Sequence, residues 1–257
     1  MKEYKFDVAK ITDEVVAWIS NWIKANGNDE TKVVVGISGG KDSSVVSALL
    51  VKALGKDRVI GVMMPNGVQK DISDSKQIAE FLGIKNYTIN INGAYEGLVS
   101  AFKESGISDF GSVFTTNTPA RLRMTTLYGV GAATGNCRVV NTCNLSEDIV
   151  GYSTFYGDAA GDFAPINKLT TEEVVAIGDY LGLPSNLTHK APSDGMCGKT
   201  DEDNLGFTYH EVNELARKNE AGPNAQKIQA KFKANKFKIN IIDLPCYVPD
   251  LPLYFEF

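Results

Sequence analysis

The sequence predicts an α/β fold, a doubly wound parallel sheet flanked by helices. Three observations support this class: short runs of β-branched and apolar residues recur, stretches with helical spacing lie between them, and Gly, Asn or Pro marks the turns. Strands that alternate with helices are typical of parallel βαβ units. Ligands bind such sheets beyond the carboxyl ends of the strands, so the residues that follow each strand are the candidates for function.

Composition limits the classes of protein that need to be considered. With 257 residues, 43% of them hydrophobic, the chain can form one large domain with a full core. A net charge of −5 argues against a general nucleic-acid or membrane surface. The four cysteines form no Cys-x-x-Cys pair, no signal peptide opens the chain, and no apolar run reaches about 18 residues. We therefore expect a cytoplasmic protein with reduced thiols.

The elements of the first half follow from the apolar pattern. Residues 6–25 carry apolar side chains at helical spacing and predict a helix that packs on the sheet. Residues 33–35 are three valines and predict a buried strand, which the helical run 45–51 follows. Residues 58–64 predict a second buried strand and residues 71–83 another helix. Strand, helix and strand in this order form a parallel βαβ unit.

The second half continues the alternation less regularly. Residues 87–91 predict a third strand, residues 95–103 a weak helix, and the Gly/Ser-rich passage 105–112 a mobile lid. The stretch 117–130, with a proline near its start, predicts a helix that precedes a buried strand at 138–142. Toward the C-terminus the pattern predicts a helix at 209–217, a basic run at 227–238 and an extended tail at 244–257.

The turn between the first strand and its helix has the composition of an anion site. It reads Ser38-Gly39-Gly40-Lys41-Asp42-Ser43, in which the glycines let the backbone approach a ligand and the helix dipole favours negative charge. The spacing excludes a P-loop, because Lys41 runs into Asp42, and it excludes the Gly-x-Gly-x-x-Gly pattern. Phosphate is the expected guest, with Asp42 able to hold Mg²⁺ against it. A glycine-rich turn without a ligand is the alternative.

Further polar segments make a family resemblance specific. The loop resembles the pyrophosphate-binding loop of the N-type ATP pyrophosphatases. Together with Ala-Arg-Leu-Arg-Met, Asn-Leu-Ser-Glu, Tyr-Gly-Asp and Ala-Pro-Ser-Asp, in this order and spacing from about Val33 to Tyr209, it resembles the ammonia-dependent NAD⁺ synthetases. The resemblance implies a Rossmann-like fold of the adenine nucleotide alpha hydrolase-like superfamily. It also implies one synthetase domain over residues 1–257, without a glutamine amidase domain.

In that family ATP adenylates the nicotinate carboxyl group of deamido-NAD⁺ and releases pyrophosphate, after which ammonia displaces AMP. The resemblance therefore implies a ligase of NAD biosynthesis, a homodimer, with ATP, deamido-NAD⁺ and ammonia as partners and Mg²⁺ as cofactor. Two alternatives remain open: an N-type ATP pyrophosphatase that adenylates a different substrate, and a nucleotide-binding regulator without turnover.

The resemblance also assigns site residues. It implies that Asp158 takes a proton from ammonium, that Lys41 and Asp42 act in catalysis, and that Asp42 and Glu147 hold Mg²⁺. Asp158 has a structural alternative, which is to cap the turn beside Gly161. The implied ATP contacts are Gly36, Ile37, Ser38, Gly39, Gly40, Lys41, Asp42, Ser43, Thr142 and Ser193, and the implied deamido-NAD⁺ contacts are Arg123, Tyr128, Asp162 and Lys236.

The chain departs from the family pattern at several positions, among them Asn235, where relatives carry the histidine of a His-Lys pair. Phe155 and Thr171 stand where many relatives carry lysine. Two cations near phosphates are thereby missing, and Lys168 or Lys190 is the candidate to compensate.

Overall fold

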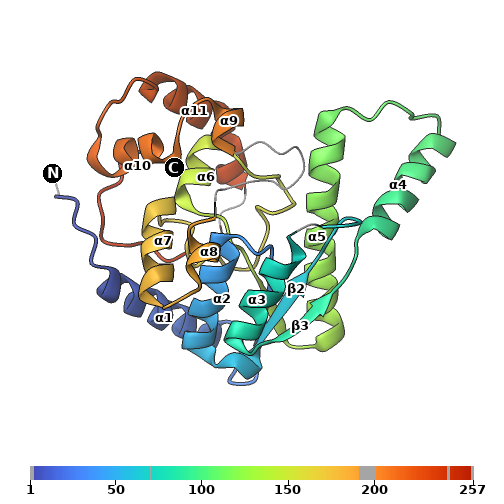
Figure 1. The fold of residues 1–257 in the computed structure, drawn as a ribbon, viewed down its shortest axis with the longest axis horizontal. Helices are drawn as coiled ribbons and strands as arrows, with labels where there is room; N and C mark the ends of the chain where they lie inside the picture. Colours follow the sequence, from blue (N-terminus) through green and yellow to red (C-terminus); the bar gives the residue numbers. More distant parts are fainter. Residues whose placement is uncertain (1–2, 70, 191–200, 242–243, 256–257) are drawn as a thin grey trace.

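A four-stranded parallel sheet lies at the centre of the molecule. The computed structural model describes residues 3–69, 71–190, 201–241 and 244–255 (Figure 1). The sheet has the order β3-β2-β1-β4, and the α/β class is confirmed. The strands are β1 (Lys32–Gly36), β2 (Val59–Met63), β3 (Lys85–Thr88) and β4 (Cys137–Val140).

The strand order creates a switch point between β1 and β4. Val34 of β1 pairs with Ile60 on one side and with Val139 on the other, both in parallel. The chain moves outward from β1 to β2 and β3, and then returns to place β4 on the opposite side of β1. The segments that leave β1 and β4 therefore lie next to each other at one edge of the sheet, where Asn144 contacts Asp42, and ligands of such sheets bind at a switch point of this kind.

Helices cover both faces of this sheet (Figure 1). Val33 and Val35 point into a core formed with one set of helices, whereas Val34 points to the opposite face, where α5 packs on β1 and β4. The first set comprises α1 (Val8–Ala25), α2 (Lys41–Leu54), α3 (Ile72–Leu82) and α7 (Thr171–Tyr180), with α8 (Ser185–Thr188) against α2. The predicted helices at 6–25 and 71–83 are confirmed within two residues.

The remaining helices form two further groups. A protruding hairpin consists of α4 (Asn92–Glu104) and α5 (Ser112–Thr134) (Figure 1). A second apolar cluster, separate from the main core, is built around Leu145 and Ile149. It joins α6 (Leu145–Val150), α9 (Asp201–Leu205), α10 (Tyr209–Lys218) and α11 (Ala225–Ile241).

The helix predicted from 117 was placed too late in the chain. α5 begins at Ser112, so Pro119 lies inside the helix rather than near its start. The passage predicted as a lid at 105–112 corresponds to the connection between α4 and α5. Tertiary packing accounts for the difference, because Phe114 contacts Phe102 and Phe110 with ring centroids 5.6 and 4.6 Å apart. This aromatic cluster stabilises two helical turns that proline near a helix start does not predict.

Strand boundaries also differ from the prediction. The predicted strand at 87–91 is shifted, because β3 starts at Lys85, where pairing with Ile60 begins, and ends at Thr88. β2 begins at Val59, after a short 3₁₀ turn, η1 (Lys56–Arg58). β4 ends at Val140, because the Asn141 N–H donates to the carbonyl of Phe163. Sheet pairing, rather than the apolar pattern, sets these ends.

Two sequence-based expectations about the chain as a whole can be compared with the structure. Among the residues that the structure describes, no helix combines the length and the apolarity that crossing a membrane requires. Cys137, Cys143 and Cys246 are free thiols, as expected, while Cys197 lies outside the described residues.

A buried ion pair fastens α7 to α10. Arg217 donates from Nε and Nη2 to the two carboxylate oxygens of Glu173, each at 2.8 Å, and both side chains are almost fully buried. Arg217 also donates to the backbone carbonyls of Lys168 and Pro252, and Tyr4 donates to Glu173. The pair is thus satisfied on all sides, and it holds the N-terminal segment and the C-terminal tail against the core.

We predict that Glu173→Gln lowers the free energy of unfolding by about 3–5 kcal/mol, because it leaves the guanidinium of Arg217 buried without its counter-charge. Urea denaturation followed by circular dichroism measures this change. Glu214→Gln is the control, since it breaks the more exposed helical pair with Lys218 and should hardly change the midpoint. Equal losses in the two variants would contradict the prediction.

Candidate active site

The glycine-rich turn after β1 has a backbone that only glycine permits. Gly39 adopts φ +79°, and a Cβ atom there would lie 2.8 Å from both the Asp74 Cβ and the Ser75 backbone nitrogen. The loop therefore packs directly on the N-terminal turn of α3. Gly40 then serves as the N-cap residue of α2, so the first N–H groups of that helix point toward the loop.

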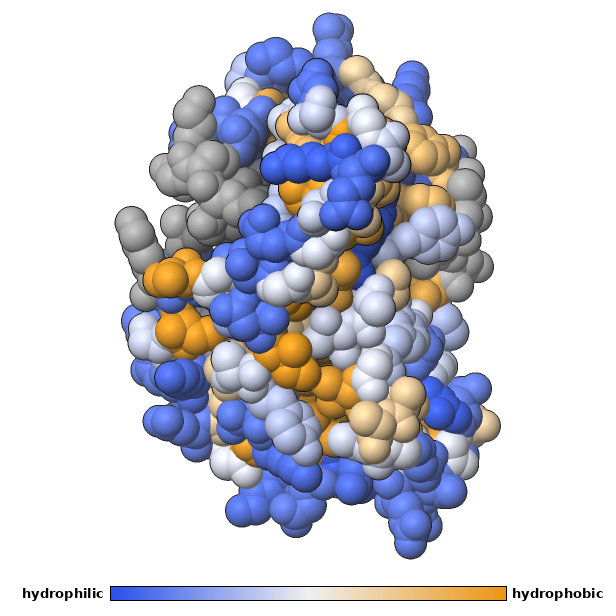
Figure 2. All heavy atoms as spheres, turned by 90° about the vertical axis from the view of Figure 1, so that its right-hand side faces the viewer, coloured by the Kyte–Doolittle hydropathy of each residue, from blue (hydrophilic) through white to orange (hydrophobic). Residues whose placement is uncertain are grey.

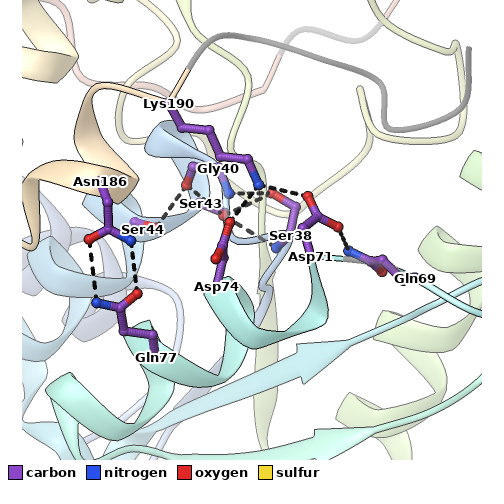
Figure 3. Close-up of polar contacts among 10 residues, drawn as sticks. All are labelled: Ser38, Gly40, Ser43, Ser44, Gln69, Asp71, Asp74, Gln77, Asn186 and Lys190. Carbon is purple, nitrogen blue, oxygen red and sulfur yellow. Dashed lines mark hydrogen bonds and ion pairs between the residues drawn. The ribbon is translucent and has the colours of Figure 1, made fainter. Parts of the chain in front are cut away.

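Serine hydroxyls brace the same loop (Figure 3). Ser38 and Ser43 are joined Oγ to Oγ at 3.1 Å, and the Gly40 N–H donates to Ser38 Oγ at 3.2 Å. Ser44 donates to the Gly40 carbonyl at 2.8 Å. The loop is held in shape by its own side chains, which leaves backbone N–H groups available to an anion.

Two carboxylates converge on this loop from the ends of β1 and β4. Asp42 lies in the first turn of α2 and Glu147 in the first turn of α6. Asn144 joins them, since its Nδ2 donates to Asp42 Oδ1 at 3.0 Å and its Oδ1 accepts from the Glu147 N–H at 3.1 Å. Asn144 and Glu147 form a capping box, and Asn-x-x-Glu before an apolar helix is the sequence signature that could have marked Asn144 as a site residue.

The charges at this point favour a divalent cation. Burial, and then repulsion from Asp42, raise the pKa of Glu147 well above its ordinary value. The ammonium of Lys41 lies 3.0 Å from Asp42 Oδ2. Burial alone would lower the pKa of Lys41, but Asp42 and Glu147 outweigh burial and raise it. Two half-buried carboxylates beside a glycine-rich loop are oxygen ligands that fit Mg²⁺.

Asp201 and Tyr209 also lie near these carboxylates, and sequence reasoning missed both. Within the described ranges, the buried Tyr209 hydroxyl has no hydrogen-bond partner. Burial first, and then Glu147 and Asp201, raise the pKa of Tyr209. α9 and α10 bring these residues to the site from more than fifty positions downstream of Glu147, and no local pattern marks them.

Tyr128 and Asp162, two of the residues assigned to the dinucleotide, come together. Tyr128 on α5 donates to Asp162 Oδ1 at 3.2 Å, and Asp162 Oδ2 accepts from the Val139 N–H at 2.7 Å. Burial, and then Asp162, raise the pKa of Tyr128 to about 12. Arg123, one turn away on α5, donates to the carbonyl of Met64 at 3.0 Å. α5 thus presents Arg123 and Tyr128 beside the ends of β2 and β4.

Asp158 lies in the turn that follows α6, and it is an exposed residue whose carboxyl group is closely surrounded by protein atoms. Its Oδ1 accepts from the Thr154 N–H at 2.9 Å, so Asp158 does shape this turn. Burial raises the pKa of Asp158, and the cations Arg123 and Lys238 lie within electrostatic range. Lys238 donates to the carbonyls of Gly151 and Ser153, at 2.9 and 3.0 Å. The ammonium of Lys236, which the sequence assigned to the dinucleotide, lies 5.8 Å from the ring centroid of Phe232.

The other assigned positions are distributed around the loop. Thr142 follows the end of β4, and Ser193 lies outside the described residues. Of the two candidate compensating lysines, Lys168 lines a cavity of about 60 Å³ together with Asp148. Lys190 pairs with Asp74, which in turn packs against the glycine-rich loop at Gly39 (Figure 3). Thr171 donates to Asn144 Oδ1 at 3.4 Å, one hydrogen bond away from Asp42.

Known proteins with similar sequences share one description. A sequence model of NAD synthase matches residues 11–244. The NH₃-dependent NAD⁺ synthetase of Pyrococcus horikoshii is 40% identical over 79% of this chain and 77% of its own length. That of Methanocaldococcus jannaschii is 37% identical over 90% of each chain.

Solved structures agree with these sequence matches. An NMN synthetase from Francisella tularensis superposes with a TM-score of 0.80 at 32% identity, covering 96% of this chain and 100% of its own. The NH₃-dependent NAD synthetase from Campylobacter jejuni gives a TM-score of 0.71 at 30% identity, covering 91% and 96%.

We predict that Asn144→Ala weakens divalent-cation binding by about tenfold, because it releases Asp42 and removes the cap that orients Glu147. Titration of Mn²⁺ into the protein, followed by electron paramagnetic resonance, measures the affinity. Thr208→Ala is the matched control, since Thr208 caps α10 in the same type of capping box. It should lower stability by about 1 kcal/mol and leave Mn²⁺ affinity unchanged. Wild-type affinity in the Asn144 variant would contradict this role.

Proposed function

Because the chain belongs to the NAD synthase family, we propose that it is an ammonia-dependent NAD⁺ synthetase. ATP adenylates the nicotinate carboxylate of deamido-NAD⁺ with release of pyrophosphate, and ammonia then displaces AMP to give the amide. The observation that carries the proposal is the convergence of Asp42 and Glu147 on the loop after β1. That geometry suits adenylyl transfer, because the negative nicotinate carboxylate of the substrate must approach the negative phosphate of ATP and the charges must be neutralised.

Each half-reaction makes a separate demand on the site. In the first, a carboxylate oxygen attacks the α-phosphorus, and the bond from that phosphorus to the pyrophosphate oxygen breaks. We infer that Asp42 and Glu147 hold Mg²⁺, which would neutralise the phosphate charge. Loop N–H groups, Lys41, Thr142 and Ser193 would bind ATP. A rate that is unchanged by EDTA would contradict the metal assignment.

The second half-reaction needs neutral ammonia beside the acyl-adenylate. Ammonium must lose a proton before its nitrogen can attack the acyl carbon and expel AMP. We assign this base role to Asp158, because its surroundings raise the pKa of its carboxyl group and it lies in electrostatic range of Arg123. Arg123, Tyr128, Asp162 and Lys236 are assigned to the dinucleotide, and the hydrogen bond from Tyr128 to Asp162 supports the assignment of these two residues to one site.

A second candidate substrate is the corresponding mononucleotide. The observation in its favour is the similarity, along the whole of both chains, to a protein described as an NMN synthetase. The chemistry at the carboxyl group and at ATP would be identical, since only the adenylate half of the dinucleotide is missing. Discrimination would depend on contacts beyond the nicotinate ribose.

We also infer a cytoplasmic homodimer in which residues 1–257 form one synthetase domain. Support comes from the α4–α5 hairpin, which carries the exposed side chains Ile107, Val113 and Tyr128, and from apolar patches on that side of the molecule (Figure 2). The family match over residues 11–244 supports a single domain. A monomer mass in sedimentation equilibrium would contradict the homodimer. Recovery in the membrane fraction would contradict the cytoplasmic location, and two independent unfolding transitions would contradict the single domain.

The activity itself is tested with purified protein, ATP, Mg²⁺ and an ammonium salt. We expect NAD⁺, AMP and pyrophosphate in equal amounts from deamido-NAD⁺, and no rate with glutamine as the nitrogen donor. The rate should rise with pH as NH₃ becomes available. Parallel assays with nicotinate mononucleotide decide between the substrates through the ratio of kcat/KM values. No turnover of either substrate would contradict the proposal.

We predict that Asp158→Asn separates the half-reactions. The variant should release pyrophosphate in a single turnover at nearly the wild-type rate but form NAD⁺ about a hundredfold more slowly. Because the pKa of Asp158 is raised, the carboxylate becomes protonated as pH falls through its pKa, and the second step of the wild type should then slow. The variant should recover partly at high pH, where free NH₃ replaces the missing base. Rapid-quench assays measure both steps, with the exposed Asp109→Asn as control. Equal loss of both steps would instead indicate a structural role.

A further inference from the structure

A charged cluster outside the assigned site lies at the rim of the phosphate loop. The Lys190 ammonium is 2.6 Å from Asp71 Oδ2 and 2.7 Å from Asp74 Oδ2 (Figure 3). Asp71 is the N-cap residue of α3 and Asp74 lies in its first turn, while Lys190 follows α8. The cluster therefore bridges two segments more than a hundred residues apart in the sequence.

This cluster is in contact with the loop. Asp74 packs against Gly39, where an added Cβ atom would approach the Asp74 Cβ to 2.8 Å. The Lys190 ammonium is thus separated from the loop backbone by one side chain. Figure 3 shows Lys190 extending across the loop, toward the side where Ser38, Gly40 and Ser43 lie.

Charge at the loop favours a second role for this lysine. The loop's own lysine, Lys41, is buried and lies 3.0 Å from Asp42 Oδ2, so part of its charge is already balanced by that carboxylate. Lys190 keeps 29% of its side chain exposed, and Asp71 and Asp74 outweigh burial to raise its pKa. Lys190 is therefore a charged and accessible cation, next to two carboxylates that an incoming phosphate would repel.

We propose that Lys190 is a phosphate-binding residue for the pyrophosphate part of ATP, held beside the loop by Asp71 and Asp74 until the nucleotide arrives. The proposal rests on the proposed function, because it assigns the loop to ATP. When ATP binds, the ammonium would give up its hydrogen bond to one carboxylate oxygen and donate to a phosphate oxygen instead. Both hydrogen bonds are charge-assisted. The exchange forms and breaks no covalent bond.

The alternative is that Lys190 is a structural latch, a residue that only holds the segment after α8 against α3. A second contact between the same segments provides a matched control. Gln77 on α3 and Asn186 on α8 exchange two amide hydrogen bonds, at 2.9 and 3.4 Å, between the same two segments (Figure 3). Asn186→Ala loosens this contact without removing a charge near the loop. A latch should respond to both changes, whereas a phosphate contact should respond only to the loss of Lys190.

The phosphate contact and the structural latch differ most in the pyrophosphate affinity they predict for variants on the two sides of the cluster. Lys190→Met should weaken binding of Mg-pyrophosphate, measured by isothermal titration calorimetry, by about tenfold or more, the usual effect of one charge-assisted hydrogen bond. It should also raise the KM for ATP more than it lowers kcat. Asp71→Asn weakens the competing hold on Lys190, so it should leave pyrophosphate affinity unchanged or increase it. Asn186→Ala should bind like the wild type, and Lys190→Arg should retain most of the affinity.

Several outcomes would overturn the proposal. Equal weakening in the Lys190→Met, Asp71→Asn and Asn186→Ala variants would identify a latch, and wild-type affinity in Lys190→Met would remove the residue from the phosphate site. If Lys190→Met does not fold, as judged by thermal melting, the Lys190→Arg and Asp71→Asn variants decide, and weakening in both would overturn it. Because inorganic pyrophosphate is the probe, a failure of the substrate assignment would appear separately, in the wild-type NAD⁺ assay.

Discussion

The adjacency of the carboxyl ends of β1 and β4 is the constraint on which the site depends. It arises because the chain builds the sheet outward from β1 on one side and then adds β4 on the other. The glycine-rich loop and α2 leave from the first strand, and Asn144 with α6 leaves from the second. Two helix N-termini therefore approach each other, and both favour the negative charge of a ligand held between them.

The molecule contains an ion pair that stabilises the fold and a pair of like charges that is suited to binding a ligand. Glu173 and Arg217 are fully hydrogen-bonded to each other and to backbone carbonyls, and this pair joins helices and both ends of the chain. Asp42 and Glu147 instead repel each other strongly enough, together with burial, to raise the pKa of Glu147. Carboxylates that repel each other in this way would be stabilised by a bound cation, and perturbed pKa values of this kind are typical of functional sites.

The site also shows how neutral groups position charged ones. Asn144 holds Asp42 and Glu147, while serine hydroxyls hold the phosphate loop from within. Asp158 participates in a turn through Thr154, so its part in shaping the backbone and its assigned part in proton transfer are compatible. Rigid hydrogen-bonded supports of this kind keep reacting groups in place without adding charge.

The sequence by itself determined the α/β class, the approximate position of each strand and the glycine-rich loop at residues 38–43. These features are local, since they depend on apolar period, glycine spacing and the residues that follow a strand. Tertiary structure alone decided the start of α5 at Ser112, the ends of β3, the position of Lys238 near Asp158 and the cluster of Lys190 with Asp71 and Asp74. Each of these features depends on contacts between segments that are distant in the chain. Local sequence patterns do not determine such contacts, because they depend on how the elements pack in space.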